Sequence, residues 1–154
     1  MDNSKEITKE EVKAIENLLF KYKKIPLMIS KLELEIEITE HTYETIRGKS
    51  DNEIVAGSRT NQNSSSVEEA LINKENRIDN LEEEIRNLKF EERAIEIALC
   101  NLTDVELGII TDKYFDKMSY QKVGNKHYFT KEWAYFTCQR IIKEKLAPFM
   151  AQLT

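Results

Sequence analysis

The stretch LTDVELGIITDKYFDKMSYQKVGNKHYFTKEWAYFTCQRIIKEKL, residues 102–146, decides the fold because it holds three helix start signals in close succession. In each signal a Ser or Thr that can cap a helix follows an apolar residue and precedes another at the fourth helical position. The signals are Leu102-Thr103 with Leu107, Met118-Ser119 with Val123, and Phe129-Thr130 with Ala134. Only the few residues from Gly124 to Phe129 separate the second helix from the third. This pattern predicts three short helices with the tight connection of a helix-turn-helix.

The composition favours an all-α chain. The 154 residues include only 4 Gly and 2 Pro, and 33% are charged, which is typical of long helices rather than of strands and turns. No apolar run approaches the roughly 18 residues of a membrane span, and we recognise no secretory leader. We therefore expect a cytoplasmic protein without membrane contact, in which Cys100 and Cys138 are free and buried thiols.

Residues 1–100 are expected to form a helical arm that precedes a helix-turn-helix domain at 101–154. The arm is predicted as helices over about 8–46 and 67–100, joined by a polar loop at 47–66. Thr8 and Glu11 form a capping box at the first helix, and Ser66 is the expected N-cap of the second. Pro26 predicts either a kink or a fresh helix with the proline in its first turn.

The second long helix carries a heptad seam of mostly Val, Leu and Ile at positions 67, 71, 74, 78, 81, 85, 88, 92, 95 and 99. Such a seam packs lengthwise against another helix. The partner is either the first helix of the same chain, in a hairpin, or the same helix of a second chain. A helix-turn-helix that reads two half-sites favours the homodimer. A further stripe of Leu27, Leu34 and Ile38 makes the apolar face of the first helix wide enough for more than one partner.

Positive charge collects near the carboxyl end although the chain carries a net charge of −5. Residues 117–150 hold two acids, Glu132 and Glu144, and seven bases, which gives a local charge of +5; the bases are Lys117, Lys122, Lys126, Lys131, Arg140, Lys143 and Lys145. A domain that approaches a polyanion needs this local field. The distribution favours double-stranded DNA as the partner of the helix-turn-helix.

The third helix of the stretch carries the side chains best suited to reading bases. Arg and Gln can pair with guanine and adenine edges, Glu can accept from cytosine, and Lys or Tyr can hold phosphates. On its outward face we expect Lys131, Glu132, Tyr135, Phe136, Gln139, Arg140 and Lys143, whereas its core face is expected to hold Trp133, Ala134, Cys138 and Ile141. The predicted DNA-binding residues are Lys117, Ser119, Tyr120, Lys122, Lys126, Thr130, Lys131, Glu132, Tyr135, Gln139, Arg140 and Lys143.

Catalytic chemistry is not expected in this chain. The two histidines, His41 and His127, lie neither at the spacing of a metal pair nor beside a plausible nucleophile. Acidic runs such as Glu82 to Glu84 are typical of solvated helix faces, and there is no glycine-rich phosphate loop. We predict no enzyme activity, no cofactor and no metal site.

The stretch from Glu75 to Leu146 resembles the small phage-encoded regulators of the RinA and ArpU type. The shared features are a Leu-Thr-x-x-Glu start, Ile-Ile-x-x-x-Tyr-Phe at the end of the first helix, Ser-Tyr-x-x-Val at the start of the second, and an Arg followed by Ile-Ile-x-x-x-Leu in the third. The carboxyl end of these regulators is similar to the promoter-reading domain of bacterial sigma factors. The resemblance implies a transcriptional activator of late phage genes that binds promoter DNA, and it suggests RNA polymerase as a second partner.

The sequence thus predicts a DNA-binding transcription regulator. A different class of function stays open, that of a coiled-coil interaction protein without enzyme activity. Its carboxyl bundle would dock on a polymerase subunit or on a phage assembly component, in the manner of a small terminase subunit.

Overall fold

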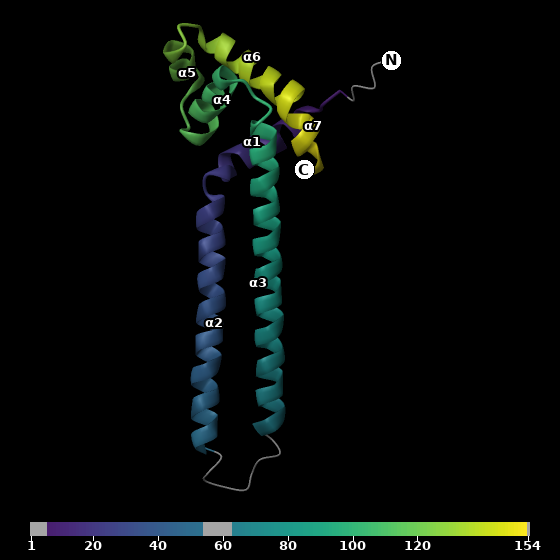
Figure 1. The fold of residues 1–154 in the computed structure, drawn as a ribbon, viewed down its shortest axis with the longest axis vertical. Coiled ribbons are helices and arrows are strands. Elements are labelled where there is room, and N and C mark those ends of the chain that lie inside the picture. The colour runs from purple at the N-terminus through teal and green to yellow at the C-terminus, as the bar shows by residue number, and fades with distance from the viewer. Residues whose placement is uncertain (1–5, 54–62, 154) are drawn as a thin grey trace. The chain divides into compact units, whose positions relative to one another are not determined.

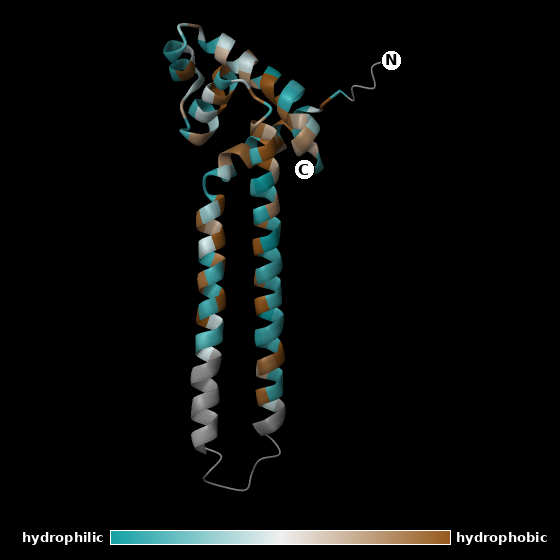
Figure 2. Ribbon diagram, viewed as in Figure 1, coloured by the Kyte–Doolittle hydropathy of each residue, from teal (hydrophilic) through white to brown (hydrophobic). Residues whose placement is uncertain are grey.

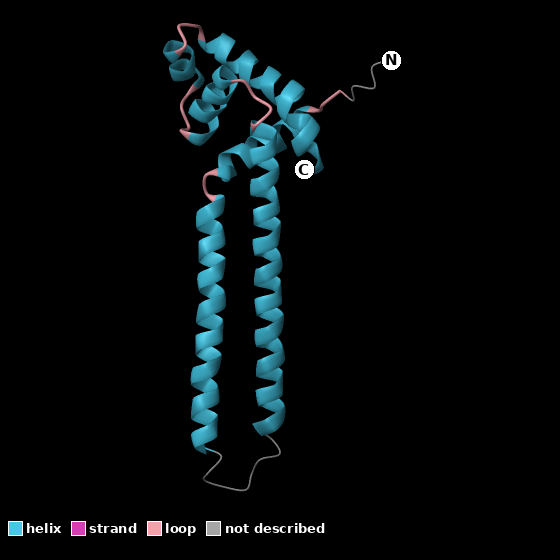
Figure 3. Cartoon of the chain, in the orientation of Figure 1, coloured by secondary structure: helices cyan, strands magenta, loops and turns pink. Residues whose placement is uncertain are grey.

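The described part of the chain is built from helices and the loops that join them. The computed structural model describes the backbone of residues 6–53 and 63–153, with the side chains of residues 6–42 and 66–153, and these residues contain no strand (Figure 3). They fall into two compact units, residues 6–25 with 90–153 and residues 26–53 with 63–89. The all-α fold predicted from the composition is confirmed.

Helices α4 (Asp104–Ile110), α5 (Tyr120–Lys126) and α6 (Lys131–Ile141) begin where the capping signals predict (Figure 1). The hydroxyl groups of Thr103, Ser119 and Thr130 accept hydrogen bonds from the third backbone N–H of their helices, at 3.3, 3.2 and 3.1 Å. Each cap satisfies a donor that the helix itself leaves unpaired. Side-chain chemistry close to each start therefore sets where these helices begin.

Two of these helices continue beyond their regular α-helical part. Helix α4 continues into the π-helical turn η2 (Thr111–Phe115). Helix α6 continues into a second π-helical turn, η3 (Ile142–Leu146), which leads into α7 (Ala147–Met150) and the 3-10 turn η4 (Ala151–Leu153). The third helix of the predicted triad is thus the start of a longer helical rod.

The amino-terminal half forms three helices whose bounds differ in part from the prediction. Helix α1 (Lys9–Tyr22) begins at the Thr8 capping box, and α2 (Ile25–Glu53) is a fresh helix with Pro26 in its first turn. Helix α3 (Asn63–Leu99) begins before Ser66, so Ser66 lies inside the helix and is not its N-cap. The predicted loop at 47–66 is wrong at both ends, because helices occupy 47–53 and 63–66; its centre, 54–62, lies outside the described residues.

In the unit formed by residues 26–53 and 63–89, α2 and α3 run antiparallel (Figure 1). Apolar residues recur along both helices (Figure 2), and the seam of α3 is buried within one chain at Leu81, Ile85 and Leu88. A hairpin of α2 and α3 within one chain therefore explains why these seam residues are buried. The stripe of Leu27, Leu34 and Ile38 on α2 stays 54 to 59% exposed.

The helix-turn-helix belongs to a larger unit than the predicted domain at 101–154. Helix α1 packs against η2, η3 and α7 through the buried side chains Val12, Ile15 and Leu19. The last residues of α3, from Phe90, also belong to this unit. The expected boundary at residue 100 does not coincide with the boundary between the units, because the core of the carboxyl-terminal helices is closed by the amino-terminal helix.

Glu106 joins the start of α4 to the end of α6 and η3. The Glu106 side chain is only 10% exposed. It accepts hydrogen bonds from the Thr103 backbone N–H at 3.0 Å and from Lys145 Nζ at 2.9 Å, and Arg140 lies at 4.0 Å. Burial alone would raise the pKa of this carboxyl group, but its bonds to Thr103 and Lys145 outweigh the burial and lower the pKa. The folded state therefore favours the ionised carboxylate.

Gly124 lets α5 approach the start of α6 more closely than any other residue would. A Cβ atom at this position would lie 2.6 Å from the carbonyl oxygen of Thr130 and 3.0 Å from that of Phe129. The carbonyl of Gly124 also accepts a hydrogen bond from the Phe129 backbone N–H at 2.8 Å. By contrast, a Cβ at Gly108 in α4 would meet nothing within 4 Å.

The two glycines predict opposite effects of the same substitution. Gly108→Ala should stabilise the protein by about 0.5–1 kcal/mol, because alanine favours a helix interior. Gly124→Ala should destabilise it by about 1–3 kcal/mol, because backbone atoms must move to admit the methyl group. Urea denaturation at equilibrium measures both changes. A gain in stability with Gly124→Ala would contradict the close approach.

The lowered pKa of Glu106 predicts an acid-sensitive stability. A carboxyl group whose folded pKa is lowered contributes stability above its unfolded pKa, near 4.5, and this contribution is lost as pH falls through the folded pKa. Glu106→Gln should lower the free energy of unfolding by about 1–3 kcal/mol at pH 7, because it removes hydrogen bonds to a charged group. The difference in stability between the variant and the wild type should become smaller in acid. Denaturation curves at pH values from about 3 to about 7, which span the usual pKa of a glutamate, would measure this change in stability.

Glu11→Gln supplies the matched control for Glu106→Gln. Glu11 holds the same position in the α1 capping box, where its carboxylate accepts from the Thr8 backbone N–H at 3.2 Å, but it has no lysine partner among the described residues. Its replacement should change the stability less and with less dependence on pH. Equal effects of the two substitutions would show that Lys145 adds nothing to the Glu106 interaction.

Candidate nucleic-acid interface

Helices α5 and α6 present a polar and aromatic face to solvent. On α6 the side chains of Lys131, Glu132, Tyr135 and Phe136 are exposed, as the helix periodicity predicts. The opposite face is buried through Ala134, Cys138 and Ile141. Burial raises the pKa of the Cys138 thiol to about 12, so this thiol is a neutral core group. Cys100 is also a free thiol, but it is exposed, so the expectation that it is buried is wrong. The outward face of the helix therefore holds the groups that are available to a partner.

Two residues of α6 lie differently from their predicted positions. Gln139 was expected to point outward, but it is half-buried and its side-chain amide donates to Glu16 Oε1 of α1 at 3.1 Å. Trp133 was expected in the core, but it is half-buried and stacks on Phe129 with ring centroids 4.2 Å apart. The packing of α1 against this unit explains the position of Gln139, since periodicity within α6 does not reveal α1 as a neighbour.

Three of the seven bases in 117–150 form ion pairs inside the protein. Lys145 and Arg140 lie beside Glu106, and Arg140 also lies 3.7 Å from Glu144. Lys126 Nζ contacts the buried carboxylate of Asp112 at 2.8 Å. Arg140 keeps a half-exposed side chain, because its two ion pairs are long. The local positive charge is thus partly compensated.

Asp112 holds the carboxyl end of α5 against η2. Its side chain is only 5% exposed, and besides Lys126 it contacts His127 Nε2 at 3.4 Å. Its backbone carbonyl accepts from the Met118 N–H at 2.9 Å, which closes the end of η2. The predicted contact residue Lys126 therefore also has a structural partner, as a buried carboxylate requires.

The remaining predicted basic residues have no ion pair with any described residue: Lys117, Lys122, Lys131 and Lys143. All four are exposed. Among the described bases of 117–150, these four ammonium groups are the ones left free for an anionic partner.

Three further predicted contact residues have roles within the fold. The hydroxyl groups of Ser119 and Thr130 are helix caps. Tyr120 is half-buried, its ring lies 5.4 Å from that of Tyr135, and Lys113 Nζ lies 3.9 Å from its centre. Burial raises the pKa of Tyr120 to about 12, so the phenol is neutral at physiological pH. A ligand that contacts these three side chains would do so while each keeps its contact within the fold.

Sequence reasoning missed the aromatic residues at the turn between α5 and α6. Tyr128 is 96% exposed and has a left-handed backbone, with φ of 62°, and Phe129 is 54% exposed. Their signal was present as two neighbouring aromatic residues in the connection of a helix-turn-helix. In the sequence pattern, Phe129 serves only as the apolar residue before the Thr130 cap. Together with Phe136, which is 67% exposed, they add apolar surface near the start of α6.

The chemistry available in the described residues is that of binding through charge, hydrogen bonds and aromatic rings. Within residues 6–42 and 66–153, whose side chains the structure describes, no group of His, Cys, Asp and Glu has the arrangement of a metal site. None of the helices in the described backbone, residues 6–53 and 63–153, combines the length and apolar character needed to cross a membrane.

Comparison with known proteins places the chain in a family. Neither a curated protein nor a solved structure gives a significant match to the chain. A family model described as "Protein of unknown function (DUF722)" matches residues 8–148, which cover all of the helices from α1 to η3. The chain therefore belongs to the DUF722 family.

Proposed function

We propose that this protein is a sequence-specific DNA-binding transcription regulator that places α6 in the major groove. The observation that carries the proposal is the capped α5 and α6 pair with the turn η3 that continues α6. The exposed Lys122, Lys131 and Lys143 of these elements have no acidic partner among the described residues. A short connection between two helices presents the amino end of the second to a groove. Lysines without partners there can neutralise phosphates without first breaking an ion pair.

The two kinds of contact fall on different side chains. Lys122, Lys131 and Lys143 would hold phosphates, and Glu132, Tyr135 and Arg140 would contact base edges. Arg140 is suited to this role, because its side chain is 51% exposed and its ion pairs at 3.7 and 4.0 Å are too long for strong hydrogen bonds. Gln139 would read a base only after leaving Glu16.

The resemblance to regulators of the RinA and ArpU type supports a setting for this activity. In that setting the protein would be a cytoplasmic activator of late phage genes and would have no enzyme activity. RNA polymerase would be its second partner.

A homodimer would allow two such helices to read two half-sites. The seam of α3 is already covered within one chain at Leu81, Ile85 and Leu88, so a dimer would form through another face. The stripe of Leu27, Leu34 and Ile38 on α2 offers exposed apolar surface for it. Sedimentation equilibrium over a range of protein concentrations measures the stoichiometry.

The exposed aromatic residues favour a second function, docking on another protein. Tyr128, Phe129 and Phe136 are the kind of rings that anchor protein interfaces. In this alternative the helix-turn-helix unit would hold a polymerase subunit or a phage assembly component. Capture of such a partner that survives Arg140→Glu with Lys143→Glu, but not Phe136→Ala, would favour docking over DNA binding.

DNA binding through Lys122, Lys131 and Lys143 predicts a defined dependence on salt. The logarithm of the association constant should fall against the logarithm of salt concentration with a slope of about −3, because each neutralised phosphate contributes about −0.9. Lys122→Gln with Lys131→Gln should reduce the magnitude of the slope by about 2. Fluorescence anisotropy with duplexes from the protein's own genomic neighbourhood provides the measurement.

Lys31→Gln with Lys89→Gln is the charge-matched control for the salt experiment. Both lysines are exposed and lie on α2 and α3, outside the helix-turn-helix unit. Their replacement should leave the slope unchanged. An equal reduction by both pairs would mean that binding follows net charge alone, and no salt-sensitive binding to any of these duplexes would overturn the proposed function.

A base contact by Arg140 predicts a loss of sequence preference. Arg140→Ala should cost about 1–3 kcal/mol on the preferred duplex and much less on unrelated duplexes, because the bidentate contact to guanine is lost. Lys143→Ala should weaken binding to all duplexes alike, because it removes a phosphate contact. Selection of bound fragments from random DNA supplies the preferred site. Equal losses on all duplexes with Arg140→Ala would exclude base reading by this residue.

A further inference from the structure

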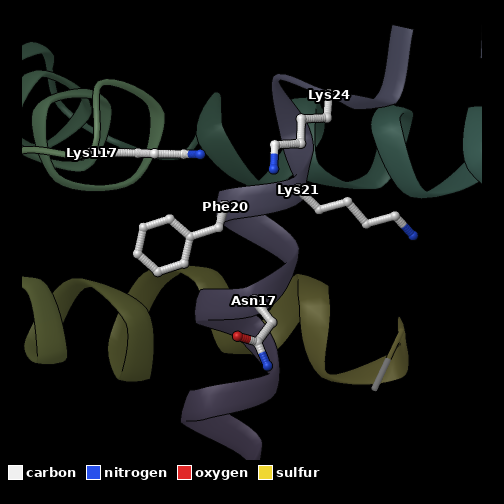
Figure 4. A pocket seen from close by; sticks show the side chains of 5 residues that line it. All are labelled: Asn17, Phe20, Lys21, Lys24 and Lys117. Atoms are coloured by element: carbon white, nitrogen blue, oxygen red, sulfur yellow. The ribbon is translucent and has the colours of Figure 1, made fainter. Parts of the chain in front are cut away.

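A basic cavity lies beside α1, away from the groups assigned to base reading. The cavity has a volume of about 450 Å³. Its walls come from α1, from the turn after α1 and from Lys117, which follows η2. The residues that line it are Asn17, Phe20, Lys21, Lys24 and Lys117 (Figure 4).

Two of the three lysines in the cavity have no charge partner in the described chain. Lys21 forms an ion pair with Glu91 at 2.8 Å, and its side chain extends away from the opening in Figure 4. The ammonium groups of Lys24 and Lys117 are directed toward the opening, and neither has an acidic partner among the described residues. Two like charges brought to one cavity repel each other unless an anion joins them. The cavity is therefore electrostatically suited to an anion.

The backbone at Lys117 is left-handed, which side-chain-bearing residues rarely adopt. Its φ is 56°, and the turn that it makes lets Met118 N–H donate to the Asp112 carbonyl at 2.9 Å, closing the helix end. Glycine is the usual residue at such a helix end, because it takes this conformation without steric cost. The backbone geometry alone would favour glycine here, so Lys117 occupies this position at a steric cost.

The neighbouring contacts hold the two walls of the cavity together. Lys23, at the end of α1, forms an ion pair at 3.1 Å with Asp116, the residue before Lys117. Phe20 packs edge-on against Tyr114, with ring centroids 5.0 Å apart. The Asn17 side chain also lines the cavity, and its amide carries both a hydrogen-bond donor and an acceptor. Lysine ammonium groups with an amide donor make a site for phosphate oxygens, and an aromatic wall beside them is suited to a base or a sugar.

We propose that this cavity binds the phosphate group of a nucleic acid or of a free nucleotide, through Lys24 and Lys117 with Asn17. The shared chemistry is a phosphate held by ammonium groups. Its source is either the backbone of DNA or a small phosphorylated molecule. The proposal does not rest on base reading by α6, and it fails or holds separately from that function.

The test uses Lys117→Gly, because this substitution separates binding from folding. It removes the ammonium group and also relieves the left-handed strain, so it should raise the denaturation midpoint while it weakens the binding of pyrophosphate about fivefold to tenfold. Lys24→Gln should weaken pyrophosphate binding similarly. Calorimetric titration with pyrophosphate at low salt measures the affinity, and the side-chain amide resonance of Asn17 reports where it binds.

Two control variants isolate strain and charge. Tyr128→Gly replaces the other left-handed residue, which lies outside the cavity, and should raise the midpoint without changing pyrophosphate affinity. Lys13→Gln removes an exposed charge of α1 that does not line the cavity, and should also leave the affinity unchanged. A loss of affinity with either control that matches the loss with Lys117→Gly would overturn the proposal.

Separate titrations with ATP and with a short DNA duplex distinguish the two sources. If ATP shifts the Asn17 resonance and Lys117→Gly weakens its binding, the cavity takes a free nucleotide. If only the duplex does so, the cavity holds the DNA backbone. If pyrophosphate, ATP and the duplex all leave the Asn17 resonance unchanged, or if Lys117→Gly lowers the midpoint and leaves each affinity unchanged, the proposal is wrong. Duplex binding that Lys122→Gln weakens and Lys117→Gly does not would preserve the proposed function and reject this site.

Discussion

The close approach of Gly124 to the Thr130 carbonyl is the constraint on which the arrangement of α5 and α6 depends. A Cβ atom there would lie 2.6 Å from that oxygen, so only glycine lets the two backbones meet at this distance. The carbonyl of Gly124 in turn accepts from the Phe129 N–H, and Thr130 caps α6. The direction of α6, and with it the position of Lys131 and of the residues that follow, is therefore set by backbone contact within the turn. Asp112 holds the same end of α5 from the other side, through Lys126.

The sequence predicted the parts of this fold that depend on local chemistry. The caps at Thr103, Ser119 and Thr130 were predictable because each bond joins residues three apart. The place of α1 in the helix-turn-helix unit was not, because its apolar stripe shows that one face is buried but not against which helix. The polar residues of 47–53 suggested a loop, yet they continue α2, since Glu, Lys and Arg are good helix formers and a single glycine is tolerated.

Counting charges along the sequence overestimates the positive charge that the candidate interface offers. The sum of +5 over residues 117–150 does not show that Glu106 lies beside Lys145 and Arg140, or that Asp112 lies beside Lys126. Glu106 and Asp112 lie outside the counted stretch, and both are buried. Buried carboxylates require partners, so part of the basic content of the region serves the fold. The positions of the free lysines, rather than the sum, describe the surface that a polyanion would meet.

Among the described residues, two residues other than glycine have a left-handed backbone, Lys117 and Tyr128, and they lie before and after α5 in the sequence. Each lets the chain turn sharply, and glycine would make either turn at a lower steric cost. One position holds an ammonium group beside a basic cavity, and the other holds a ring that is 96% exposed. Neither side chain adds to the buried core. Strain that the core does not require, at two exposed positions around one short helix, is typical of residues kept for contact with a ligand. The stability of this unit and the binding proposed for it would therefore place opposite demands on the same two positions.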